Sequence, residues 1–179
     1  MANQYLITID VGTSSIKTAL WTEKGEAVVE VSSSYALSRP QPLWVEIDPM
    51  LWWEAVCKTT QQVLAQSGVD ANDIVGVGID AVGWTLVPVD ADSNPLTPAM
   101  IWQDRRAEVE AAWLNSLSDA QNLINLSANP IDAAYLTPKL IWLKKNQPKI
   151  FAAAHKFLEA TGFIVAKFTN EFICDYTQA

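Results

Sequence analysis

Short runs of apolar and β-branched residues, separated by clusters of turn-forming residues, open the sequence. The runs 5–10, 16–21 and 27–35 have the length and composition of β-strands. The clusters between them, 11–15 and 23–26, are short, and each holds a glycine. Since connections this short join antiparallel neighbours, the pattern predicts a three-stranded meander.

A helix is expected after the meander, and further strands after the helix. Residues 48–49 are Asp-Pro, the types preferred at the N-cap and first position of a helix, and Gly68 marks its end. The apolar run 74–80 predicts a buried strand, and 84–89 predicts the next one. A short strand is also expected within 98–102.

The spacing of apolar residues becomes helical over the last part of the chain. It predicts five helices, at 104–116, 119–126, 137–146, 148–154 and 161–168. Strands first, then a helix, two more strands and a helical tail describe a mixed α/β protein. We expect a mixed five-stranded sheet whose first three strands are antiparallel, with flanking helices.

Composition narrows the classes of partner. With 50% hydrophobic and 18% charged residues, the 179-residue chain can bury a core and is not intrinsically disordered. Its formal net charge of −8 repels nucleic acid and anionic membrane surfaces, so neither is expected as a partner. The most apolar stretch, 74–89, contains Asp80 and Pro88, which excludes a membrane span.

The cysteine and histidine content excludes two further classes of site. Two cysteines are too few for a disulfide framework, and the single histidine, His155, cannot make a His-rich zinc site. The amino terminus lacks the basic segment of a secretory signal, so we expect a cytoplasmic protein.

The segment 9–17, Ile-Asp-Val-Gly-Thr-Ser-Ser-Ile-Lys, carries the clearest chemistry. A tight turn after a strand points backbone N–H groups into one concavity, which suits a phosphate. Gly12 has no Cβ and lets a phosphate approach the backbone. Thr13, Ser14 and Ser15 add hydroxyl donors, and Asp10 can hold a hydrated Mg²⁺. The spacing matches neither the Walker A loop nor the Rossmann fingerprint. On spacing alone, an ordinary hairpin turn remains the alternative.

This segment resembles the first phosphate motif of the sugar kinase, heat-shock ATPase and actin superfamily, whose domains have a ribonuclease H-like fold. Further segments resemble the FGGY carbohydrate kinases, and they occur in the order of that family. They are Pro-Leu-Trp-Val-Glu-Ile-Asp-Pro at 42–49, Ile-Trp-Gln-Asp-Arg-Arg at 101–106, Thr-Pro-Lys-Leu-Ile-Trp-Leu at 137–143 and Glu-Phe-Ile-Cys-Asp-Tyr at 171–176. The chain looks most similar to the xylulokinases, with some resemblance to glycerol kinases and gluconokinases.

The resemblance implies ATP-dependent phosphorylation of a small sugar or polyol, in first place a ketopentose such as xylulose, with Mg²⁺. It also implies that residues 1–179 form the amino-terminal part of the first kinase domain, in a ribonuclease H-like fold. The catalytic base of the family lies in a loop downstream of Asp175, and the second, ATP-binding domain is absent as well. The isolated chain should therefore be inactive. The alternatives are a non-catalytic sugar-binding or assembly module that keeps the fold, and a gluconokinase-like or glycerol kinase-like specificity.

The resemblance assigns the phosphate side of the site to the first turn. Asp10 corresponds to the catalytic aspartate that interacts with Mg²⁺–ATP and the reacting hydroxyl. Gly12, Thr13 and Ser14 match the loop under the nucleotide phosphates. Lys17 stands where the family often has a basic residue, although a solvated strand lysine is an equal alternative.

The sugar side is implied by two later segments. Val82, Gly83 and Trp84 occupy the turn where xylulokinases carry a Met-His-Gly that touches the sugar, so this departure leaves the identity of the sugar open. Trp102 and Asp104 match positions that contact the polyol or ketose; an indole packs on sugar C–H groups and a carboxylate accepts hydroxyl hydrogens.

Some of these residues have a second interpretation. Trp84 could be a core residue, and Asp104 could also be the N-cap of the helix at 104–116. Asp80 could reach a sugar hydroxyl or cap a turn. Finally, an incomplete domain should expose apolar surface, so we expect self-association, as a homodimer, through that face.

Overall fold

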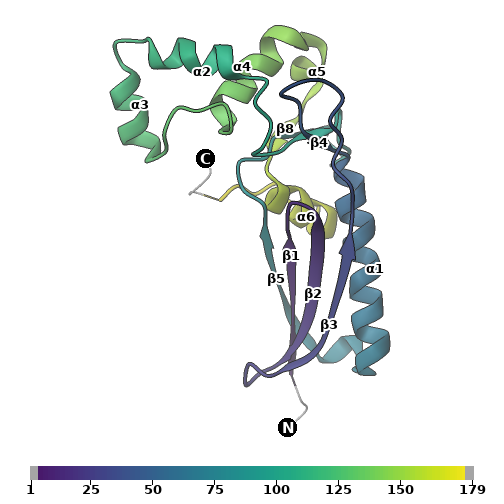
Figure 1. Cartoon of the computed structure of the whole chain (residues 1–179). Coiled ribbons are helices and arrows are strands. Elements are labelled where there is room, and N and C mark those ends of the chain that lie inside the picture. Colours follow the sequence, from purple (N-terminus) through teal and green to yellow (C-terminus); the bar gives the residue numbers. More distant parts are fainter. Residues whose placement is uncertain (1–3, 176–179) are drawn as a thin grey trace. The chain divides into compact units, whose positions relative to one another are not determined.

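The computed structural model describes residues 4–175, which form two compact units (Figure 1). Unit 1 takes the described residues up to Ala36 together with Met50–Ala81. Unit 2 takes Leu37–Pro49 together with the described residues from Val82 onward. Each unit is built around its own elements.

Unit 1 is a four-stranded mixed sheet with one long helix. The strand order is β3-β2-β1-β5; β1 pairs antiparallel with β2 and parallel with β5, and β2 pairs antiparallel with β3. The predicted meander is therefore confirmed. The elements are β1 (Tyr5–Val11), β2 (Ser15–Thr22), β3 (Ala27–Ser34), α1 (Pro49–Ser67), the 3₁₀ turn η1 (Ala71–Asp73) and β5 (Ile74–Ala81).

Alternation along the strands decides which face of this sheet is buried. In β1, Ile7, Ile9 and Val11 are buried while the residues between them are exposed, as expected for a period of two. Helix α1 packs on the buried face, where the hydroxyl groups of Thr18 and Thr59 meet at 2.7 Å without any exposed surface. The predicted limits of this helix are confirmed.

Unit 2 contains short strands and five helices among its described residues. Its strands form two antiparallel pairs, β4–β7 and β6–β8. One apolar cluster gathers Leu86, Met100 and Leu143, and a second gathers three alanines. The elements are β4 (Glu46–Ile47), β6 (Val87–Val89), β7 (Ala99–Met100), α2 (Glu108–Asn115), α3 (Ala120–Ser127), α4 (Leu136–Asn146), α5 (Pro148–Ala153), β8 (Lys156–Leu158) and α6 (Ala160–Thr169).

The sheet differs from expectation in its number of strands. The run 84–89 was expected as the fifth strand, but β6 takes up only its last three residues and pairs with β8 in unit 2. The extended conformation breaks at Trp84, whose φ is +50°. Strand β8 has three residues between two helices, too few for a recognisable period.

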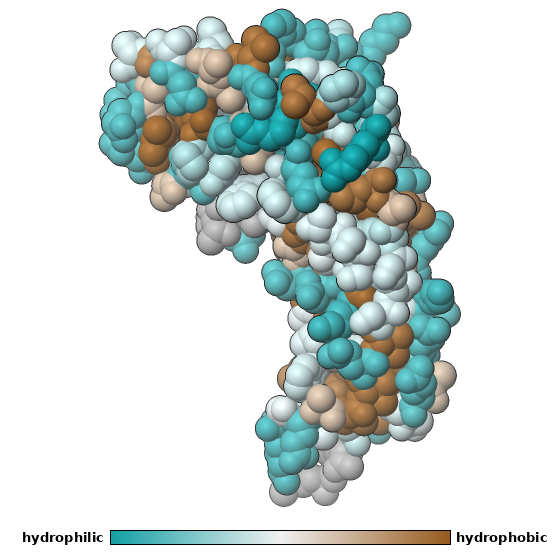
Figure 2. Space-filling model, in the orientation of Figure 1, coloured by the Kyte–Doolittle hydropathy of each residue, from teal (hydrophilic) through white to brown (hydrophobic). Residues whose placement is uncertain are grey.

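Helix α2 also begins later than expected, at Glu108 with Ala107 at the N-cap, so the N-cap interpretation of Asp104 is wrong. Over α2 and α3, apolar side chains interrupt the polar surface (Figure 2). The exposed apolar residues of these helices are Val109, Trp113, Leu123 and Leu126. Among the described helices, none combines the length and apolarity needed to cross a membrane.

Candidate functional site

Tyr35 stabilises the turn after β1 through contacts with the backbone of the turn. The backbone N–H of Gly12 donates to the Ser15 carbonyl at 2.9 Å, and that of Tyr35 donates to the Ser14 carbonyl at 3.1 Å. The Tyr35 hydroxyl contacts the carbonyls of Gly12 and Ser15. Burial raises the pKa of Tyr35, so this hydroxyl stays protonated and remains a donor. The shape of the turn is thus fixed before any ligand arrives.

Gly12 is needed by the turn itself. A Cβ at this position would lie 3.0 Å from the Ser15 carbonyl oxygen, which is tighter than ordinary contacts. The sequence predicts that the missing Cβ lets a phosphate approach the backbone. In the structure, the space where a Cβ would be is also close to the Ser15 carbonyl, so the fold of the turn itself favours glycine here.

Several side chains of the turn and next to it are exposed to solvent. Asp10, Ser14 and Lys17 are exposed, and Thr13 is half-buried. Had this bend been packed inside the core, the phosphate interpretation would have failed. Lys17 lies 3.8 Å from Glu30 on β3, with both side chains about half exposed, and such a pair is weak.

Asp10 does not stand alone at the end of its strand. In the parallel pairing of β1 with β5, Asp10 is directly opposite Asp80, and both carboxylates are exposed. Side chains at paired positions of neighbouring strands emerge on the same face of the sheet. Two carboxylates therefore stand side by side beside the turn. The sequence alone could not reveal this, because it does not show which strands pair in parallel.

On the sugar side, Trp84 packs against a second aromatic residue that the sequence did not single out. The rings of Trp84 and Tyr135 lie 4.8 Å apart with an angle of 42° between their planes. Both residues are half-buried, and they line a pocket of about 300 Å³ whose wall is otherwise mainly apolar. Val82 and Gly83 directly precede Trp84, and their carbonyls accept from the Thr85 hydroxyl at 3.2 Å.

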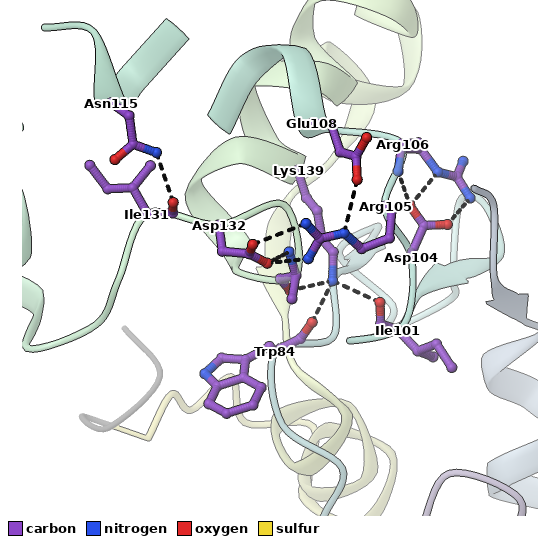
Figure 3. Close-up of polar contacts among 11 residues, drawn as sticks. Trp84, Ile101, Asp104, Arg105, Arg106, Glu108, Asn115, Ile131, Asp132 and Lys139 are labelled. Carbon is purple, nitrogen blue, oxygen red and sulfur yellow. Dashed lines mark hydrogen bonds and ion pairs between the residues drawn. The ribbon is translucent and has the colours of Figure 1, made fainter. Parts of the chain in front are cut away.

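The two predicted polyol contacts, Trp102 and Asp104, differ sharply in exposure. Trp102 is 40% exposed, whereas Asp104 is fully buried. The Asp104 carboxylate accepts from the Val45 backbone N–H at 2.6 Å. It also accepts from the backbone N–H, Nε and Nη2 of Arg106 at 3.1, 2.8 and 2.7 Å, as Figure 3 shows. Sugar contact by Asp104 stays a prediction; in this structure the carboxylate serves the protein interior.

Arg106 is the centre of a buried cluster. Besides Asp104, it binds Glu46 at 2.7 Å. Its guanidinium carbon lies 3.6 Å from the centre of the Trp44 ring and 5.1 Å from that of Trp142. The cluster joins residues from three separate segments of unit 2.

The adjacent Arg105 makes a more exposed ion pair. It binds both oxygens of Asp132, with Nη2 to Oδ2 at 3.0 Å, and it also reaches Glu108 (Figure 3). The guanidinium lowers the pKa of the Asp132 carboxyl. Asp132 in turn accepts from the Ala134 backbone N–H at 2.9 Å, next to Tyr135.

The predicted residues therefore fall into two groups. Those expected at the phosphates, Asp10, Gly12–Ser14 and Lys17, lie in unit 1. Those expected at the sugar, Val82–Trp84, Trp102 and Asp104, lie in unit 2. The open turn lies in unit 1, and the pair of Trp84 and Tyr135 lies in unit 2.

Comparison with solved structures identifies the class of fold. A gluconate kinase from Lactobacillus acidophilus superposes with a TM-score of 0.88 at 25% identity, over 95% of this chain and 34% of that protein. The expected ribonuclease H-like, or actin-like, fold class is thereby confirmed.

Sequence comparison identifies the family. The chain belongs to the FGGY family of carbohydrate kinases, whose N-terminal domain matches residues 5–179. The xylulose kinase of Escherichia coli (strain K12) is 32% identical over 173 residues, which are 97% of this chain and 35% of that protein. The glycerol kinase of Polaromonas sp. is 34% identical over 161 residues, 89% of this chain and 32% of that protein. The chain thus spans about a third of the length of these relatives.

Proposed function

We propose that the protein to which this chain belongs transfers the γ-phosphate of ATP to a hydroxyl of a small sugar or polyol. The substrate that we favour is a ketopentose such as xylulose. In that reaction the sugar oxygen bonds to the γ-phosphorus, the bond to the bridging β–γ oxygen breaks, and the hydroxyl proton passes to a base. The family resemblance assigns this base to a loop downstream of Asp175.

The open turn at the end of β1 is the observation that carries this proposal. Tyr35 contacts the backbone of the turn, Ser14 within the turn is exposed, and Asp10 is exposed beside it. A turn of fixed shape can present N–H and hydroxyl donors to phosphate oxygens without reorganising when the nucleotide binds.

Kinases of this family use ATP, generally with Mg²⁺. Among residues 4–175 there is no group of three or more potential metal-ligating side chains. This agrees with the usual manner of Mg²⁺ binding, through one or two carboxylates with water and substrate phosphates supplying the rest. Asp10, with Asp80 opposite it, would hold the ion, which when bound neutralises charge on the phosphates.

Trp84, Tyr135 and the partly exposed Trp102 are the best candidates for sugar contact. Aromatic faces pack on the C–H groups of a sugar, while hydroxyl groups need polar partners. The relatives include xylulose kinases, glycerol kinases and a gluconokinase, and several of the xylulose kinases match 97–98% of this chain. Xylulose is therefore the first substrate to test.

The test is coupled ADP formation by the full-length protein with xylulose, ribulose, gluconate and glycerol. We expect turnover with at least one of them, strongest with xylulose. Calorimetric binding of a sugar without turnover would instead indicate the non-catalytic module. Turnover with none of the panel and no sugar binding would refute the proposal.

A pair of variants tests the role of the turn. Asp10→Asn should lower kcat by about a hundredfold or more, because it removes a carboxylate proposed to bind the metal. Glu26→Gln is the control, since Glu26 is an exposed carboxylate between β2 and β3, at the opposite end of these strands from the turn, and should leave kcat unchanged. Equal activity of the two variants would remove Asp10 from the catalytic site.

A further inference from the structure

Lys139, on α4, is a lysine with no exposed surface. Lysine is rarely buried completely, because its ammonium must then be satisfied inside the protein. Here the ammonium nitrogen lies 2.6 Å from the Ala134 carbonyl oxygen, 2.7 Å from that of Trp84 and 2.8 Å from that of Ile101. The Met100 carbonyl is more distant, at 3.4 Å. The three close acceptors equal the three N–H donors of an ammonium.

These three carbonyls belong to three separate segments. Each is the carbonyl of an aromatic residue or of the residue directly before one. Trp84 contributes its own carbonyl, Ile101 directly precedes Trp102, and Ala134 directly precedes Tyr135. Figure 3 shows the bonds from Lys139 to Trp84 and Ile101. One side chain thus holds the backbone at all three aromatic residues of the candidate sugar side.

The backbone at Trp84 explains why such a restraint is needed. Its φ of +50° is in the left-handed region, which is unfavourable for a bulky residue. Conformations of this kind persist only where the surroundings impose them. The bond from Lys139 to the Trp84 carbonyl and the packing of the Trp84 ring on Tyr135 both act on this residue.

Burial lowers the pKa of Lys139, while the charged groups around it act at longer range: Asp104 and Asp132 favour its charged form, and Arg105 and Arg106 oppose it. The three close carbonyl oxygens can only accept hydrogen bonds, so they too favour the ammonium form. Its close partners are neutral carbonyls, so its role differs from that of Arg105 and Arg106, whose partners are carboxylates. The ammonium of Lys139 binds backbone carbonyls, whereas the two arginines bind side-chain carboxylates.

We propose that Lys139 is a positioning residue for the sugar substrate: its ammonium fixes the relative positions of Trp84, Trp102 and Tyr135, and thereby the shape of the sugar side. This inference rests on the proposed kinase function. Lys139 itself need not touch the sugar; its effect passes through the three backbone segments that it joins.

The test compares Lys139→Met with Lys144→Met in the full-length protein. Methionine keeps the length of the side chain without its donors, and Lys144 is an exposed lysine of the same helix. Lys139→Met should raise KM for the sugar by about tenfold or more while kcat and KM for ATP stay within about threefold, since the loss is in sugar binding. Lys144→Met should change none of these constants.

A second variant covers the case in which Lys139→Met does not fold. Lys139→Arg keeps the charge but spreads its donors over a planar fork, so it should fold and still raise KM for the sugar, by about threefold or more. A sugar KM within error of wild type in every folded Lys139 variant would overturn the inference.

A spectroscopic measurement separates this inference from the proposed function. In protein labelled with fluorotryptophan, the ¹⁹F resonances of Trp84 and Trp102, assigned with Trp84→Phe and Trp102→Phe, should move in the Lys139 variants. That of Trp21 in unit 1 should not. Unmoved resonances of Trp84 and Trp102 would overturn the positioning role whatever the activity. Absence of turnover in the wild type would instead refute the proposed function, and the role toward sugar would fail with it.

Discussion

Arg105 and Arg106 are neighbours in sequence, yet their carboxylate partners differ in burial, so they allow a matched test of the buried cluster. The side chains of Arg106 and Asp104 are 1% and 0% exposed, whereas those of Arg105 and Asp132 are 38% and 39% exposed. We predict that Asp104→Asn destabilises unit 2 strongly and that Asp132→Asn does so weakly. The two substitutions are chemically identical.

The expected magnitude follows from the bonds of Asp104. Its two oxygens accept four hydrogen bonds, three of them from Arg106. Each oxygen accepts two of these bonds, so the NH₂ group of an asparagine would face two donors, and the buried guanidinium would keep Glu46 as its carboxylate partner. Removing one member of a buried pair costs about 3–5 kcal/mol, while an exposed pair is worth about 1 kcal/mol or less.

Urea unfolding followed by tryptophan fluorescence measures the difference. With a slope of about 2 kcal/mol per molar, Asp104→Asn should lower the midpoint by about 2 M and Asp132→Asn by about 0.5 M or less. Similar midpoints for the two variants would refute the reasoning. If Asp104→Asn were as stable as wild type and raised KM for the sugar, the carboxylate would belong to the substrate site after all.

Three further substitutions test other parts of the structure. Gly12→Ala should destabilise the chain by about 1 kcal/mol and raise KM for ATP in the full-length protein, because its Cβ would press on the Ser15 carbonyl. Tyr35→Phe should lower the free energy of unfolding by about 1–2 kcal/mol, measured by urea titration, since it removes the hydroxyl that contacts the turn. Burial, and secondarily Asp175, raises the pKa of Glu159 from 4.5 to about 7, so the folded state holds this proton more tightly than the unfolded chain. The stability that the protonated Glu159 contributes is complete below pH 4.5 and is lost as the pH rises through 7. The free energy of unfolding of Glu159→Gln should therefore equal that of wild type at pH 4. At pH 8 it should exceed that of wild type by up to about 3 kcal/mol.

The fold was predictable wherever the local pattern was long enough. The meander and the long helix α1 have many residues in one period and clear turn or cap residues at their ends. The assignment of 84–89 to the main sheet failed because composition cannot show a left-handed residue at Trp84. The pairing of β6 with β8 joins residues about seventy apart in sequence, and no local pattern encodes it.

The candidate site was predictable in its residue types more than in its contacts. The order of a carboxylate, a glycine and hydroxyl residues after a strand indicated the turn, and the structure leaves that turn open. The positions of Asp80 and Tyr135 beside their partners depend on strand register and loop packing, which the sequence does not specify. The sequence pattern predicts Tyr35 only as the end of a strand, although its hydroxyl contacts the turn.

The motif segments themselves acquire a physical explanation from the buried cluster. The segments 42–49, 101–106 and 137–143 are distant in sequence, but in unit 2 they meet: Glu46 and Asp104 bind Arg106, whose guanidinium faces the rings of Trp44 and Trp142. A guanidinium buried in this way requires both its carboxylates and its aromatic neighbours, because a lost carboxylate leaves buried charge uncompensated and a lost ring removes a cation–π contact. The motifs therefore depend on one another through packing, and a residue's presence in such a motif is by itself no evidence that it touches substrate. Direct contact with a ligand is better sought among residues that the cluster leaves accessible, of which Trp102, next to Ile101 in the same segment, is the clearest.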